Sequence, residues 1–228
     1  MLDILVVSAH PDDAEIGMGA TILKMADEGF RVGILDLTDG EPTPTGNPKL
    51  RIDESKEAAK LLKVKTRITL DLPNRFLEDS IPARKKVANV YRKLKPSALF
   101  IPYWHDAHPD HVAASQIADA ARFYSKLTKT TLTGDPHYPS KIFYYFSTHL
   151  RMMVKPSFIV DTSKYHEQKL KAVKVYKSQF NKKRGNLEVF DKINALNHIY
   201  GLMIRRKYGE IFLCKEEIGI EKLKGLIL

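Results

Sequence analysis

A histidine and an aspartate follow the first apolar run of the chain at a spacing that suits metal binding. The stretch SAHPDDAEIG (8–17) places His10 and Asp13 around Pro11, directly after the run ILVV. Proline fixes its φ angle and favours a turn, so both side chains can converge on one divalent cation. The pair alone is ambiguous, because Asp12 or Asp13 could equally serve as the N-cap of a following helix.

A second motif, HPDH at 108–111, repeats this chemistry about a hundred residues later and supplies His108, Asp110 and His111. Two histidines and one carboxylate leave one position of a tetrahedral zinc ion open, which is typical of hydrolytic zinc sites. The only cysteine, Cys214, excludes an internal disulfide and a multi-cysteine zinc cluster. Taken together, the two motifs predict a single site for one zinc ion.

Residues left over after the metal ligands have the side chains that amide hydrolysis needs. A zinc-bound water is acidic, but attack on an amide also requires a base and a proton donor for the leaving amine. Asp12 is placed to be the base. His108, with Asp110 to orient and charge its imidazole, is placed to be the acid or to stabilise the oxyanion. Glu15 is expected to face the positive end of the helix dipole, and the nearby His105 to lie on the surface.

These motifs need a scaffold, and the chain alternates apolar β-rich runs with segments of helical periodicity. The alternation predicts an α/β fold, Rossmann-like, with a mainly parallel twisted sheet and helices on both faces. It predicts one domain over residues 1–228, with two C-terminal helices (164–178 and 187–207) and a possible extra edge strand at EIFLC (210–214). The expected strands are 3–8, 31–38, 67–72, 98–103, 141–146 and 157–162, and the earlier helices are 16–28, 50–62, 81–94 and 112–123. In such folds the site forms where strands end at their carboxyl edge.

Composition narrows the function classes. The chain has no apolar run of membrane-spanning length and no signal-peptide pattern, so we expect a cytoplasmic protein without a membrane partner. The net charge of +10 is largely local, because residues 151–186 contain ten Lys or Arg against Asp161 and Glu167. These cations are spread over a strand, a helix and a loop, which favours a solvated surface or a subunit boundary over a nucleic-acid groove.

The motifs AHPDDAEIGMGATI and HPDH resemble the zinc-dependent deacetylases of the PIG-L or LmbE-like family. The resemblance extends to LTDGE (37–41), LRIDESKEAAKLL (50–62) and LPNRFL (72–77). Three later stretches look closest to the bacillithiol-biosynthesis branch, which deacetylates N-acetylglucosaminyl malate; they are KPSFIVDTS (155–163), YKSQF (176–180) and YGEIF (208–212).

The resemblance implies a role for each matching residue. It implies zinc on His10, Asp13 and His111, Asp12 as general base, and His108 supported by Asp110 as general acid. It implies a small-molecule N-acetyl-sugar substrate contacted by Arg51, and a homo-oligomer such as a hexamer. Asn74 stands where the bacillithiol branch usually has an aspartate, and we expect it to bind substrate.

The oxyanion donor departs from the family pattern. Relatives supply a tyrosine either just before HPDH or in a later GY segment, and this chain has Asp106 at the first place and LEVF (187–190) at the second. Three tyrosines are conceivable substitutes, although each fits the core better: Tyr103, Tyr176 and Tyr200.

Other interpretations of the same motifs remain. HDAHPDH (105–111) is similar to the metal motif of metallo-β-lactamase-like hydrolases, but the first two histidines are one residue too far apart. A two-histidine, one-carboxylate set could also hold Fe(II). GMGA (17–20) weakly suggests a nucleotide binder, although its glycines fall within an expected helix. A non-catalytic, basic nucleic-acid-binding protein is the alternative outside the enzymes.

Overall fold

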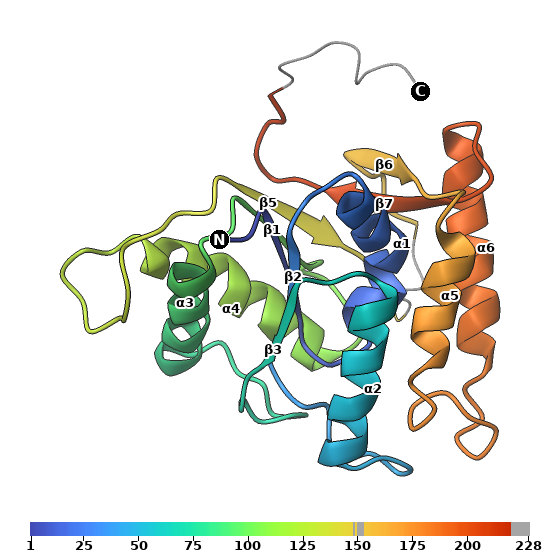
Figure 1. Cartoon of the computed structure of the whole chain (residues 1–228), viewed down its shortest axis with the longest axis horizontal. Helices are drawn as coiled ribbons and strands as arrows, with labels where there is room; N and C mark the ends of the chain where they lie inside the picture. The colour runs from blue at the N-terminus through green and yellow to red at the C-terminus, as the bar shows by residue number, and fades with distance from the viewer. Residues whose placement is uncertain (148, 150–152, 220–228) are drawn as a thin grey trace.

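A seven-stranded sheet in the order β3-β2-β1-β4-β5-β7-β6 forms the centre of the molecule in the computed structural model (Figure 1). The structure describes residues 1–147, 149 and 153–219. The first five strands of this order pair in parallel, which confirms the predicted α/β class with a mainly parallel sheet. Their bounds are β1 (Ile4–Ser8), β2 (Val32–Asp36), β3 (Thr66–Thr69), β4 (Ala98–Pro102) and β5 (Lys141–Tyr145).

The last strand in the chain lies inside the sheet, so the expectation of an edge strand at 210–214 is wrong. Strand β7 (Gly209–Leu213) inserts between β5 and β6 (Phe158–Asp161) and runs antiparallel to both. Its first four residues are buried, as an interior position requires. The edge is occupied by β6, whose residues are all half-buried.

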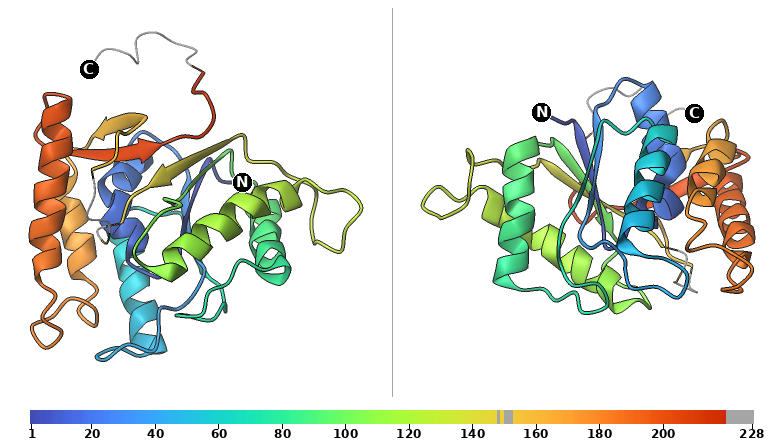
Figure 2. Two further views of the ribbon diagram at one scale, coloured as in Figure 1. Left: turned by 180° about the vertical axis from the view of Figure 1, so that it is seen from behind. Right: turned by 60° about the horizontal axis from the view of Figure 1, so that its bottom comes forward.

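Helices cover both faces of the sheet, as the buried strands require (Figure 2). Strand β1 is buried throughout; Leu5 and Val7 face the cluster beneath α3 and α4, and Ile4 and Val6 face the cluster beneath α1. Helices α5 and α6 lie outside α1 and α2 at one end of the molecule (Figure 1). The bounds are α1 (Asp13–Asp27), α2 (Pro48–Leu61), α3 (Ile81–Leu94), α4 (Pro109–Ser125), α5 (His166–Lys174) and α6 (Glu188–Met203). In the described part of the chain, we find no helix with the length and apolar character to span a membrane.

Helix α1 is interrupted one turn after it begins. Met18 has φ −148° and ψ 25°, which breaks the helical hydrogen bonding and leaves backbone donors to be satisfied. The Glu210 carboxylate of β7 accepts from the N–H groups of Ala20 and Thr21 at 3.2 and 2.7 Å, and it pairs with the buried Lys169 at 2.6 Å. The last strand therefore caps the second half of α1 and separates it from the first turn, which begins at Asp13.

Candidate active site

A cavity of about 470 Å³ opens where β1 and β4 end, next to each other in the sheet. Strand β1 pairs with β2 along one edge and with β4 along the other, so the strand order reverses at this place. Crevices at such switch points are where ligands bind in open α/β sheets. Both histidine motifs follow these two strands, and their side chains line the cavity; they include His10, Asp12, Asp13, His108 and His111.

The predicted metal ligands His10, Asp13 and His111 converge on one point of this cavity. One ligand atom from each lies within 4.8 Å of the others, and all three residues are buried. The Asp13 carboxylate lies 3.4 Å from Nδ1 of His10 and 3.2 Å from Nε2 of His111. Two imidazole nitrogens and a carboxylate oxygen are ligands that zinc takes in proteins, so the donor set fits that ion.

Carboxylates hold both imidazoles in their protonated form when no metal competes. Burial disfavours the charge on His10, but Asp13 and Asp110 outweigh it and raise its pKa to about 9. Burial likewise opposes protonation of His111, and Asp13 with Asp106 raises its pKa to about 10. A cation bound here would therefore replace protons on both rings.

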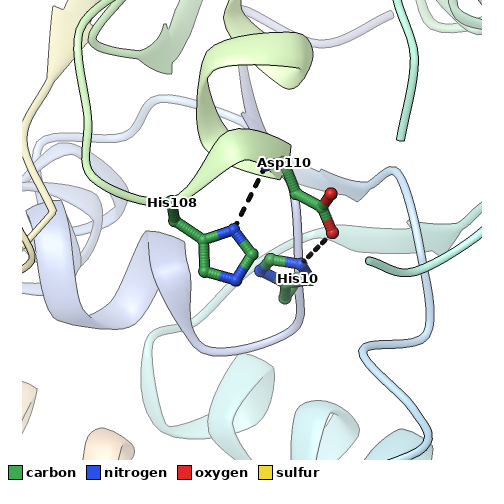
Figure 3. A group of neighbouring side chains, drawn as sticks. All are labelled: His10, His108 and Asp110. Carbon is green, nitrogen blue, oxygen red and sulfur yellow. Dashed lines mark hydrogen bonds and ion pairs between the residues drawn. The ribbon is translucent and has the colours of Figure 1, made fainter. Parts of the chain in front are cut away.

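Each histidine of the set also contacts a second carboxylate through its other ring nitrogen. Nε2 of His10 lies 3.0 Å from Asp110 (Figure 3), and Nδ1 of His111 lies 3.2 Å from Asp106. Such carboxylate–histidine contacts fix the orientation of metal ligands and make them more basic. Sequence reasoning missed this role of Asp106, since the residue was considered only as the replacement of a tyrosine. Its position five residues before His111 was the available signal.

The Asp110 carboxylate, expected to support His108, makes its hydrogen bonds elsewhere, and none among the described residues joins it to the His108 ring. That carboxylate accepts from His10 and from the backbone N–H groups of Arg75 (2.7 Å) and Leu77 (3.3 Å). His108 is instead the N-cap of α4, and its Nδ1 accepts from the backbone N–H of Asp110 at 3.2 Å (Figure 3). The cause is the helix start: Asp110 points its side chain away from its neighbour and toward the end of β1.

The N-cap contact assigns the tautomer of His108. With Nδ1 accepting, a neutral ring carries its proton on Nε2. Burial, together with the positive charges of His111 and His10, lowers the pKa of His108 to about 4. The ring is thus a neutral donor beside the metal ligands.

Asp12 is a buried carboxylate held in an uncommon backbone conformation. Its φ of 121° lies in the region that favours glycine, so the surrounding structure must over-determine it. One carboxylate oxygen lies 3.0 Å from Nη2 of Arg51. Burial raises the pKa of Asp12; Arg51 opposes the shift, and Asp13 adds to it.

The predicted substrate residues Arg51 and Asn74 both line the cavity. Arg51 is only 3% exposed, and its Nε and Nη1 have no hydrogen-bond partner among the described residues. Buried donors without partners are costly, which makes them candidates for contact with a ligand. Further cations line the same cavity, none of them singled out from the sequence: Arg75, Arg184 and Lys192.

His149 is another cavity residue that sequence reasoning missed. Its ring centroid lies 5.3 Å from that of His111 and 5.8 Å from that of His108. It follows β5 with no motif around it, so no sequence signal pointed to it. Arg151, counted in the basic segment 151–186, lies outside the described residues.

Several residues near the motifs lie away from the cavity. Glu15 lies in the first turn of α1, as expected, and is fully buried; it lies 2.5 Å from Arg67 and accepts from the Tyr176 hydroxyl at 2.9 Å. His105 is exposed, as predicted. Among the described residues, no tyrosine lines the cavity. The three tyrosines considered as oxyanion donors therefore lie outside it: Tyr103, Tyr176 and Tyr200.

The chain is similar to known proteins over nearly all of its length. A family profile, PIG-L, described as GlcNAc-PI de-N-acetylase, matches residues 5–122, which contain both motifs. Diacetylchitobiose deacetylase of Thermococcus kodakarensis is 33% identical over 241 residues, covering 99% of this chain and 84% of that protein.

Two solved structures are similar over most of the fold. The conserved protein TT1542 from Thermus thermophilus superposes with a TM-score of 0.89 and 37% identity, covering 96% of this chain and 97% of that chain. N,N'-diacetylchitobiose deacetylase from Pyrococcus horikoshii, complexed with its inhibitor MPG, superposes with a TM-score of 0.79. The two sequences are 31% identical, and the match covers 92% of this chain and 82% of that chain.

Proposed function

The chain belongs to the PIG-L family of de-N-acetylases, and on that premise we propose that it is a zinc-dependent hydrolase that removes the acetyl group from an N-acetylglucosamine conjugate. The observation that carries the proposal is the convergence of His10, Asp13 and His111 in a cavity that also contains Asp12 and His108. A zinc ion on those three ligands would supply a Lewis acid for the amide carbonyl and lower the pKa of water.

Asp12 is the proposed base. Its carboxylate is buried beside the ligand set, and its raised pKa brings it toward the pH at which a base can accept a proton and return it. It takes a proton from the attacking water and passes it to the leaving amine, so the products are acetate and a free amino sugar. Arg51, 3.0 Å away, fixes the carboxylate in place.

His108 is proposed to stabilise the oxyanion. A neutral ring with its proton on Nε2 is a hydrogen-bond donor and a poor proton source, which favours this role over that of general acid. The ring also stands in for the tyrosine that relatives use, since no described tyrosine lines the cavity.

The sugar's second substituent is proposed to be anionic, such as the malate of N-acetylglucosaminyl malate in bacillithiol biosynthesis. The unpartnered Nε and Nη1 of Arg51 would be satisfied by carboxylate oxygens, to which a guanidinium is matched. Arg75, Arg184 and Lys192 add positive charge to the cavity wall. The competing substrate is a neutral disaccharide, as in the relatives named for diacetylchitobiose.

The test is acetate and amine release from a panel containing N-acetylglucosaminyl malate, N-acetylglucosaminyl inositol, diacetylchitobiose and free N-acetylglucosamine. We expect turnover that a chelator abolishes and zinc restores, fastest with malate, and lost in Asp12→Asn although that variant still binds zinc. Asp71→Asn, at an exposed carboxylate outside the cavity, is the matched control. A zinc-loaded protein that releases no acetate from the panel, and binds DNA with a steep salt dependence instead, would overturn the proposal.

A further inference from the structure

Tyr176 lies against Arg51, although the tyrosine does not line the cavity. It follows α5, which lies beside α1 and α2 (Figure 1), and it is fully buried. Cζ of Arg51 lies 5.3 Å from the centroid of the Tyr176 ring. A guanidinium over an aromatic face is attracted by the ring and can stack on it. The ring therefore supports the side chain that contacts Asp12 in the cavity.

Few hydrogen bonds fix the orientation of the Arg51 guanidinium. Nη2 contacts Asp12 at 3.0 Å, and Nε and Nη1 have no hydrogen-bond partner among the described residues. Gly40, in the loop after β2, approaches the same group, since a Cβ added there would lie 3.3 Å from Nε. One ion pair leaves a long side chain several rotamers, so packing against the ring and the glycine selects one of them.

The Tyr176 ring is itself held in place by a buried ionic network. Its hydroxyl donates to Glu15 at 2.9 Å, and Glu15 lies 2.5 Å from Arg67. Arg67 in turn donates to both carboxylate oxygens of Asp36 on β2, at 2.7 and 2.9 Å. Bidentate pairs of this kind are geometrically specific. The network thus anchors the ring to the sheet.

A second contact ties the segment after α5 to α2. Glu54 accepts from the backbone N–H of Ser178 at 2.8 Å and from its hydroxyl at 2.6 Å. Glu54 follows Arg51 by three residues, which places both side chains on one face of α2. Tyr176 and Ser178 therefore hold neighbouring points of that face.

We propose that Tyr176 is a positioning residue for the deacetylation. Its ring holds the Arg51 guanidinium in the orientation that fixes Asp12 and leaves Nε and Nη1 free for the substrate. The hydroxyl has a different role, because it donates to Glu15 and anchors the ring. The inference rests on the proposed function and adds to it a residue outside the cavity.

Two substitutions separate the ring from the hydroxyl. Tyr176→Leu removes the ring, and kcat for N-acetylglucosaminyl malate should fall by up to about 100-fold, since a displacement of about 1 Å can cost that much. KM should rise as well, because Arg51 loses its orientation toward the substrate. Tyr176→Phe keeps the ring and should retain most of the activity. Equal losses in the two variants would overturn the proposal.

Tyr91 provides the matched control. It is also fully buried, and its hydroxyl donates to the backbone carbonyl of Ala118 at 3.1 Å, but it packs in the cluster beneath α3 and α4. Tyr91→Leu should lose stability in urea unfolding as Tyr176→Leu does, while its kcat and KM stay near the wild-type values at a temperature where both variants are folded. A comparable fall of kcat in Tyr91→Leu would overturn the proposal, because any large cavity in the core would then have the same effect.

A double-mutant cycle tests whether Tyr176 acts through Arg51. In the Arg51→Lys background the guanidinium is already gone, so Tyr176→Leu should lower kcat/KM by much less than it does in the wild type. The same fold-loss in both backgrounds would overturn the proposal, since the ring would then act independently of Arg51.

Nuclear magnetic resonance follows the contact without turnover. An aromatic ring shifts the resonances of protons near its face, so the Nε–H signal of Arg51, assigned by its loss in Arg51→Lys, should be shifted in the wild type. Tyr176→Phe should keep this shift and Tyr176→Leu should remove it. An Arg51 signal that does not move in Tyr176→Leu would overturn the inference and leave the proposed function standing. Absence of acetate release, together with a shift that depends on the ring, would overturn the proposed function while supporting the contact.

Discussion

Nε2 of His10 lies 3.0 Å from the carboxylate of Asp110, although one residue follows β1 and the other begins α4. The same carboxylate accepts from the backbone of Arg75, next to the cavity residue Asn74. Asp110 thus joins a candidate metal ligand to the loop that carries a candidate substrate residue.

Asp110→Asn should weaken zinc binding by about 10- to 100-fold, the usual effect of removing a carboxylate that supports a metal-ligating histidine. The amide keeps the shape but loses the charge that makes His10 basic. Competition with a chromophoric chelator gives the affinity directly. Asp135→Asn, at an exposed carboxylate paired with Lys95, is the control. Equal affinity in wild type and Asp110→Asn would contradict this role.

Zinc affinity should rise steeply with pH. His10 and His111, with pKa values of about 9 and 10, are protonated in the metal-free protein at neutral pH, and zinc requires both rings neutral. Binding then releases up to two protons, so the association constant should grow by up to about 100-fold per pH unit and level off near those pKa values. Calorimetry in buffers of different ionisation enthalpy counts the protons. A count of zero would show that the rings are neutral beforehand.

The metal-free protein should show the opposite trend in stability. Both histidine pKa values are raised above 6.5, so their contribution to folding is fully present below pH 6.5 and is lost as pH rises through 9 to 10. Urea midpoints measured in chelator should therefore fall over that window. Because other groups titrate there, the comparison is with His10→Gln/His111→Gln, whose midpoint should fall less. If the urea midpoint fell equally in both proteins, the result would argue against raised pKa values for His10 and His111.

Arg51→Lys should discriminate between substrates. Lysine keeps the positive charge beside Asp12 but lacks the two further donors, Nε and Nη1, that have no partner among the described residues and that could each donate to a substrate oxygen. We expect kcat/KM for N-acetylglucosaminyl malate to fall about tenfold more than kcat/KM for diacetylchitobiose, a differential of roughly 1.4 kcal/mol. An equal fall of kcat/KM for both substrates would mean that Arg51 acts only on Asp12 and does not contact the aglycone.

Glu210→Ala should be strongly destabilising, by about 3–5 kcal/mol, because it leaves Lys169 buried without its counter-charge. It also removes the acceptor for the backbone of Ala20 and Thr21. The double variant Lys169→Met/Glu210→Leu should lose less, since it removes both charges together. Urea unfolding measures each value. A single variant as stable as the double would mean that the ion pair has little effect.

The alternation of strands and helices in the sequence predicted the parallel part of the sheet. It did not predict the position of β7, which depends on pairing between segments far apart in the chain. Alternating strands and helices specify parallel neighbours through β5, because each crossover is right-handed. The insertion of β7 between β5 and β6 has no local signature, because a short, mainly apolar run such as EIFLC fits either an interior strand or an edge strand. The ion pair of Glu15 with Arg67 was likewise not predicted, since Glu15 lies on α1 and Arg67 on β3, 52 residues later in the chain.

For the site too, the sequence predicted one part and not the other. Residue type and spacing indicated which side chains gather at the ends of β1 and β4, and the geometry brings those side chains together. Pairing within the site did not follow from spacing. Asp110 is two residues from His108 but contacts His10, because the first turn of a helix sends successive side chains in different directions.

The adjacency of β1 and β4 has a consequence for how the protein matures. His10 and His111 come from distant parts of the chain and meet only when Ile4, Leu5 and Val6 pair with Ala98, Leu99 and Phe100. A slip of one residue would shift one motif by about 3.3 Å along the sheet and turn its strand over. Contacts between distant segments form late, since the loop between them must first be ordered. Tight zinc uptake would therefore report that this pairing is complete, and it could time the end of folding in a refolding experiment.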